Sequence, residues 1–73
     1  MCLAIPAKII RLDGTHAEVD IIGVRKQINT LLVEHLSVGD KVLVHAGFAI
    51  NKIDEEYFDF LKGTLEGLLG DVP

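Results

Sequence analysis

The cysteine of this 73-residue chain is Cys2, directly after Met1. Cytosolic methionine aminopeptidase removes Met1 when the next residue is small, so we expect Cys2 to become the N-terminus. Its thiol and free α-amine would then lie on adjacent carbons. Such a pair can chelate a soft or borderline metal, or act as a nucleophile that uses the amine as its base. An isolated cysteine can also be a small buried apolar residue.

Three histidines are the next candidates for metal binding or proton transfer. His16 and His35 fall at a predicted strand start and in a predicted loop, where plain surface residues are typical. His45 lies in the apolar stretch KVLVHAGFAI. It could be a hydrogen-bonded residue of the barrel wall, a partner in a Cys/His metal site, or a group that promotes ionisation of Cys2. A closed structural zinc site takes four ligands, so a metal held by Cys2 and His45 would be shared with a partner.

The elements that position these residues are predicted from hydrophobic periodicity and turn residues. Asp13-Gly14 is a hairpin signal, and Pro6 places the start of the first strand at a sheet edge. Residues 33–38 are predicted to be a connecting loop. The predicted strands cover residues 3–12, 16–22, 24–32 and 41–50, the last continuing near 49–53 after a bend at Gly47.

A helix is predicted over about residues 54–69, with Asp54 as its N-cap. Its apolar stripe consists of Phe58, Leu61, Leu65 and Leu68, at helical spacing. We expect this stripe to join the core, although it could also serve a partner.

This order of elements predicts a mainly β fold, a small OB-like five-stranded β-barrel with a C-terminal α-helix. Periodicity alone does not separate an OB-like from an SH3-like barrel. The length fits a single domain over residues 1–73, with the barrel at about 3–53 and the helix at about 54–69.

Composition argues against several classes of partner. The formal net charge is −4 and the basic residues are scattered, whereas nucleic-acid-binding proteins are usually basic. No apolar stretch is long enough to span a membrane. Lys8 and Arg11 interrupt the pattern of a signal peptide. We therefore expect a cytoplasmic protein that binds neither nucleic acid nor membrane.

Two motifs resemble those of the HypC/HupF/HybG family of nickel–iron hydrogenase maturation chaperones. MCLAIP fits the pattern Met-Cys-[Leu/Ile]-x-[Ile/Val]-Pro, and GDKVLVHAGFA fits Gly-Asp-x-Val-x-[Val/Ile]-His-x-Gly-Phe-Ala. DGTHAEVDIIGVRKQINTLLV lies between them, so the likeness runs from residue 2 to about residue 62. One departure is Ala7, where the family commonly has glycine. Alanine disfavours a positive φ, so we expect an ordinary backbone there.

The resemblance implies a scaffold and carrier without enzymatic activity. Family members work while the hydrogenase iron acquires two cyanides and one carbon monoxide. They pair with the iron–sulfur protein HypD and then with the precursor of the hydrogenase large subunit. The family's essential cysteine matches Cys2, and its strand histidine matches His45. The cargo would be the Fe(CN)2CO unit, held transiently by Cys2 and shared with a partner, with Leu3, Ile5 and Pro6 as a partner-binding patch.

Two other functions compete with this one. An N-terminal cysteine nucleophile, as in glutamine amidotransferases, would need an oxyanion hole and a substrate pocket, for which 73 residues leave little room. An OB-type nucleic-acid-binding module would need a basic groove with stacking aromatics on its strands. Three of the four aromatics instead lie in the predicted helix, at Tyr57, Phe58 and Phe60.

Overall fold

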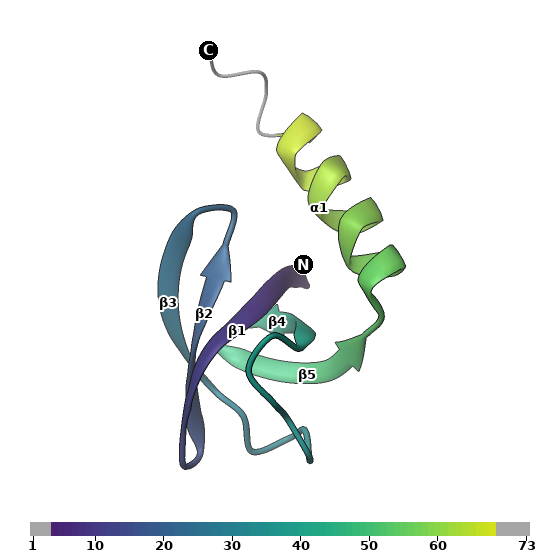
Figure 1. Cartoon of the computed structure of the whole chain (residues 1–73). Helices are drawn as coiled ribbons and strands as arrows, with labels where there is room; N and C mark the ends of the chain where they lie inside the picture. Colours follow the sequence, from purple (N-terminus) through teal and green to yellow (C-terminus); the bar gives the residue numbers. More distant parts are fainter. Residues whose placement is uncertain (1–3, 69–73) are drawn as a thin grey trace.

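The computed structural model describes residues 4–68, which form a closed β-barrel and one helix (Figure 1). Its elements are β1 (Ile5–Asp13), β2 (His16–Ile21), β3 (Val24–Asn29), β4 (Lys41–His45), β5 (Phe48–Ile53) and α1 (Glu55–Leu68). The strands follow the order β1-β2-β3-β5-β4 around the barrel. Because β4 returns to pair with β1, the first four strands form a Greek key. This confirms the predicted five-stranded OB-like barrel with a C-terminal helix.

Small aliphatic side chains fill the barrel. Ile9, Val19 and Val42 are the largest side chains with essentially no exposed surface. They pack with Ala7, Ala17, Ile28, Val44 and Ala49. Ala7 is fully buried and is not among the residues with positive φ, as predicted for alanine at this position.

Two predicted strand ends are wrong, and both errors have a local cause. The third strand ends at Asn29 rather than at residue 32, because the Asn29 side-chain Oδ1 accepts a hydrogen bond from the Leu31 N–H at 2.8 Å. This contact stabilises a turn in place of the ladder. The predicted strand over 41–50 is instead a hairpin, since Ala46 and Gly47 both have positive φ, 53° and 85°. That combination is typical of a two-residue type I′ turn.

The predicted N-cap of the helix is confirmed. The Asp54 side-chain Oδ1 accepts a hydrogen bond from the Tyr57 N–H at 2.7 Å. Lys41 of β4 joins the first turn of α1 to the barrel. Its Nζ lies 3.0 Å from Glu55 Oε1 and 5.9 Å from the centre of the Phe58 ring. The hydrogen bond and the positive charge of Lys41 both hold the pKa of Glu55 below its ordinary value.

The apolar stripe of α1 joins the core only at its beginning. Phe58 is buried, Leu61 and Leu65 are half-buried, and Leu68 is 79% exposed. The expectation that this stripe joins the core is therefore confirmed at Phe58, in part at Leu61 and Leu65, and not at Leu68. The helix leaves the end of β5 and rises past the start of β1, so it lies beside the barrel and is buried only in its first turn, at Phe58 (Figure 1).

Phe58→Ala should lower the free energy of unfolding by about 3 kcal/mol, because it removes a buried aromatic ring. Urea unfolding followed by circular dichroism measures this loss. Phe60→Ala is the matched control, since Phe60 is 68% exposed. Equal effects of the two substitutions would contradict Phe58 as the anchor of the helix.

Ala46→Asn should raise the free energy of unfolding by about 1 kcal/mol, because asparagine tolerates the left-handed region better than alanine does. Gly47→Ala should lower it, although no atom lies within 4 Å of the added Cβ. Thermal unfolding of both variants is the measurement. A destabilised Ala46→Asn protein would argue against the assigned turn.

Asp40 ties the loop before β4 to β5. Its Oδ2 accepts a hydrogen bond from the Ser37 N–H at 2.8 Å and lies 3.3 Å from Lys52 Nζ. The hydrogen bond from the Ser37 N–H is the main cause that holds the pKa of Asp40 below its ordinary value, and Lys52 lowers this pKa further.

The folded protein should therefore lose stability in acid. Since the folded pKa of Asp40 is lowered, the stabilisation is complete above the unfolded pKa near 4 and is lost as pH falls through the folded pKa. Asp40→Asn should flatten this part of the stability curve, measured by urea unfolding from pH 6 downwards. Asp59→Asn, at an exposed helix position, should leave the curve unchanged. A curve with the same slope in Asp40→Asn would refute the assignment.

Candidate functional site

The pairing of β1 with β4 brings the N-terminal segment beside His45. The antiparallel register runs from Lys8↔Lys41 to Ile5↔Val44. Extended by one residue, this register sets Ala4 opposite His45, the last residue of β4. His45 is half-buried and also pairs with Phe48 across the hairpin. The topology thus brings His45 and the start of β1 together at one end of the barrel.

Only some of the predicted site residues lie in the part of the chain that the structure describes. Cys2 and Leu3 lie outside the described residues. Ile5 is half-buried, and Pro6 is buried within β1. Pro6 pairs with Leu43 of β4, while the ladder between β1 and β2 begins only at Lys8. Proline therefore stands where the sheet leaves one side of the strand unpaired, as expected for a residue without an N–H.

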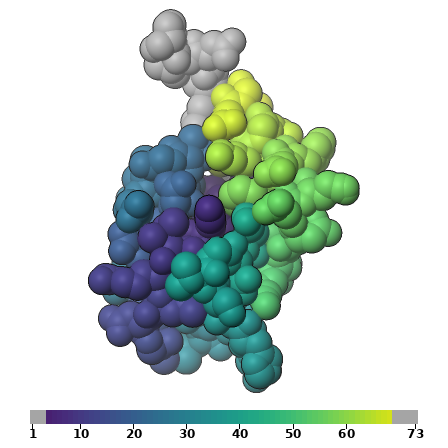
Figure 2. Space-filling model, viewed as in Figure 1, coloured from purple at the N-terminus to yellow at the C-terminus, as the bar shows by residue number. Residues whose placement is uncertain are grey.

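An apolar groove separates the start of β1 from α1. It encloses about 120 Å³. Its lining residues are Ala4, Pro6, Leu61, Thr64, Leu65 and Leu68. Figure 2 shows the purple start of β1 against the green and yellow side chains of the helix. Sequence reasoning identified the helix stripe and the residues around Pro6 separately, but it did not predict that they face one groove.

A second hollow lies beside the same end of β1. Pro6 also lines this space of about 280 Å³, together with Lys8, Lys41 and Glu55. The Lys41–Glu55 ion pair crosses from β4 to α1 here. The surface around Pro6 is therefore apolar toward the distal turns of α1 and charged toward the first turn.

The described residues alone do not assemble a metal site. Within residues 4–68, no group of three or more His, Cys, Asp or Glu side chains is placed to hold a metal ion. His45 is the described member of the predicted Cys2–His45 pair, so the structure gives no distance for that pair. The helix within the described range is too short and too polar to cross a bilayer.

Comparison with known proteins identifies relatives along most of the chain. A model of the HupF/HypC family matches residues 1–61. Hydrogenase maturation factor HypC of Cupriavidus necator is 51% identical over 57 residues, which cover 77% of this chain and 63% of the relative. The protein of the same name in Azotobacter chroococcum is 52% identical over 56 residues, or 75% of this chain and 67% of the relative.

A more distant relative gives the same result. Hydrogenase maturation factor HypC of Escherichia coli K12 is 38% identical over 61 residues, which cover 75% of this chain and 68% of the relative. The aligned region thus spans about two thirds of each relative's length, and slightly less for the Cupriavidus protein. Because the family match includes both motifs and the whole barrel, this chain belongs to the HupF/HypC family.

Proposed function

We propose that this chain acts in hydrogenase maturation, as a scaffold and carrier for the Fe(CN)2CO unit and not as an enzyme. The observation that carries the proposal is family membership over residues 1–61, a range that includes Cys2 and His45. The relatives' name, hydrogenase maturation factor, supports the same process. The iron unit is the cargo in this scheme.

The chemistry of the cargo suits a single terminal thiolate. Cyanide and carbon monoxide are strong-field ligands, and a thiolate is a soft donor that can accompany them on low-spin iron. A carrier must also release its cargo, which one protein ligand permits more readily than a closed set of four. Partner cysteines complete the coordination in this scheme.

The position of Ala4 supports a role for His45 beside Cys2. The register sets Ala4 opposite His45, and two extended residues span roughly 7 Å. A thiolate two residues before Ala4 can therefore reach only groups around this end of the barrel. We assign His45 to this site as a group that hydrogen-bonds the thiolate or the cyanide ligands of the cargo.

The partners would dock around the same end. We propose a HypD-type iron–sulfur protein and the hydrogenase large-subunit precursor, contacting Leu3, Ile5 and Pro6. The apolar groove beside Pro6 supports this arrangement, since exposed apolar surface rimmed by polar residues is typical of protein interfaces. A reduced thiol is also best preserved in the cytoplasm, where we place this work.

Cys2→Ala should leave the fold intact and abolish the maturation role, because a residue before the first strand contributes little packing. The measurement is anaerobic co-purification of wild type and Cys2→Ala with the partner, followed by infrared spectra and iron analysis. We expect cyanide and carbon monoxide stretching bands with the wild type and their loss with Cys2→Ala.

Two controls separate the possible failures. His16→Ala changes an exposed histidine at the start of β2 and should keep the bands. Circular dichroism of Cys2→Ala tests the fold, and an unfolded variant would contradict the separation of structure from function. A partner that stays bound through Cys2 without iron bands on this chain would make it a docking scaffold and refute the carrier role.

A further inference from the structure

The strand β3 is fully paired on one side and almost unpaired on the other. Its register with β2 runs from Val24↔Ile21 to Asn29↔His16. With β5 the described chain forms one parallel pair, Asn29↔Phe48. The two strands diverge from that point, with β3 at the left of the barrel and β5 across its bottom (Figure 1). Residues 24–28 therefore form an open sheet edge.

One hydrogen bond establishes which backbone groups of β3 face this edge. The Asn29 N–H donates to the Gly47 carbonyl at 2.8 Å, so Asn29 faces β5. Backbone direction alternates along a strand. Gln27 and Arg25 therefore point their N–H and C=O groups to the open edge, whereas Lys26 and Ile28 point theirs to β2. An edge of this kind is a template for an added strand.

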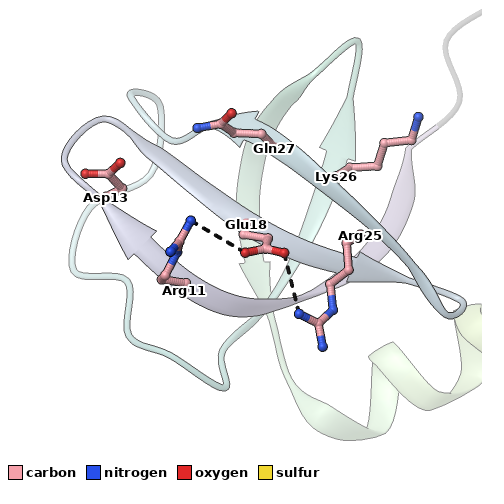
Figure 3. Close-up of a pocket in the computed structure, with 6 residues that line it drawn as sticks. All are labelled: Arg11, Asp13, Glu18, Arg25, Lys26 and Gln27. Carbon is pink, nitrogen blue, oxygen red and sulfur yellow. Dashed lines mark hydrogen bonds and ion pairs between the residues drawn. The ribbon is translucent and has the colours of Figure 1, made fainter.

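A charged cavity lies on the outer face next to this edge. It encloses about 290 Å³ and is lined by Arg11, Asp13, Glu18, Arg25, Lys26 and Gln27. Figure 3 shows Glu18 between two arginines, with Arg11 Nη2 at 3.7 Å from its Oε1 and Arg25 Nη1 at 3.5 Å from its Oε2. The two arginine side chains are 73% and 61% exposed. Exposed pairs of this length are weak and exchange readily.

The charges at this cavity favour an acidic occupant. Arg11, Arg25 and Lys26 are three of the seven Lys and Arg residues of a chain whose net charge is −4. A guanidinium has five N–H donors, and Glu18 engages few of those on Arg11 and Arg25. A second carboxylate at this edge can therefore bind Arg25, the arginine of β3, in the bidentate manner that arginine favours.

We propose that the open edge of β3 binds an extended acidic segment of a partner protein as an added strand. The segment's backbone would pair with Arg25 and Gln27, and its alternate carboxylates would lie on the outer face, where they meet Arg25 of the same strand. This surface uses none of the residues assigned above to the cargo, so it stands independently of the carrier role.

Other occupants fit the edge less well. β2 and β3 contain no Phe, Tyr or Trp on which nucleic-acid bases could stack. In a second copy of the chain, the densest acidic run begins at Asp54, which caps α1 through its bond to Tyr57. That run is already folded into the start of the helix and is not available as an extended strand.

Amide hydrogen exchange measured by NMR tests the proposal with a defined probe. The probe is an acetylated and amidated six-residue peptide that alternates glutamate and valine. In the free protein the Arg25 and Gln27 amides should exchange fast, and the Lys26 and Ile28 amides slowly. Millimolar acidic peptide should slow exchange at Arg25 and Gln27, while a lysine–valine peptide should not.

Two variants separate the backbone contribution from the charge contribution. Gln27→Pro removes an N–H that faces the open edge, so it should keep the β2–β3 ladder and abolish peptide binding. Arg25→Gln should weaken binding about tenfold, the effect of losing one charge-assisted hydrogen bond. Lys62→Gln makes the same change of charge on α1 and should leave the affinity unchanged.

Three results would overturn the proposal. The first is no slowing at Arg25 and Gln27 with the acidic peptide, and the second is equal binding of the lysine peptide or of the Gln27→Pro protein. The third is protection of these amides that grows with protein concentration in the absence of peptide, which would identify the occupant as a second copy of the chain. None of these results bears on iron binding through Cys2.

Discussion

The pairing of β1 with β4 is the constraint on which the rest of the structure depends. Four residue pairs, from Ile5↔Val44 to Lys8↔Lys41, join the first strand to the fourth. They join β1 to β4 and so close the sheet into a barrel, in which β3 meets β5 at one residue pair and keeps the open edge described above. The same pairs bury Ala7 against the other core residues. They also bring the start of β1 to the end of β4, where His45 lies, so fold and candidate site share one cause.

The filled interior decides where chemistry can occur. Ile9, Val19 and Val42 occupy the barrel axis without exposed surface, so a bound group must lie on the outside. Small-molecule enzymes usually enclose their substrate in a concave apolar pocket. A carrier has the opposite need, because its cargo must be reachable from a second protein. A packed barrel is consistent with the proposed role, in which the iron ligand is Cys2 and not a group inside the barrel.

The sequence predicted the architecture well because local signals agreed with the global fold. Alternation in HAEVDI, the Asp13-Gly14 turn and the Asp54 cap each correspond to the observed elements. A bend at Gly47 with a strand after it was predicted, but the tight hairpin at Ala46-Gly47 was not, since alanine is a poor signal for a left-handed residue. The end of β3 at Asn29 was missed because one side-chain hydrogen bond replaces the ladder there.

The candidate site was predictable only in part. Motif spacing predicted Cys2 and His45, and the strand register, extended by one residue, sets Ala4, which lies two residues after Cys2, opposite His45. The groove between Pro6 and Leu65 depends on how α1 packs, which no local pattern records. The open edge of β3 is likewise a property of the whole sheet, since it exists because parallel β5 meets β3 at one residue pair.

The shallow anchoring of α1 has a consequence for cooperativity. Phe58 and the Lys41–Glu55 pair couple the first turn to the barrel, whereas Leu68 is largely in solvent. Opening free energies should therefore decline along the helix, and its last turns should unfold in many molecules whose barrel stays intact. Gly63 and Gly67 lower helix propensity, so they reduce the opening free energy of the distal turns further. We therefore expect the barrel to be rigid and the distal turns of α1 to open readily. A ligand that orders these turns would spend part of its binding free energy on ordering them.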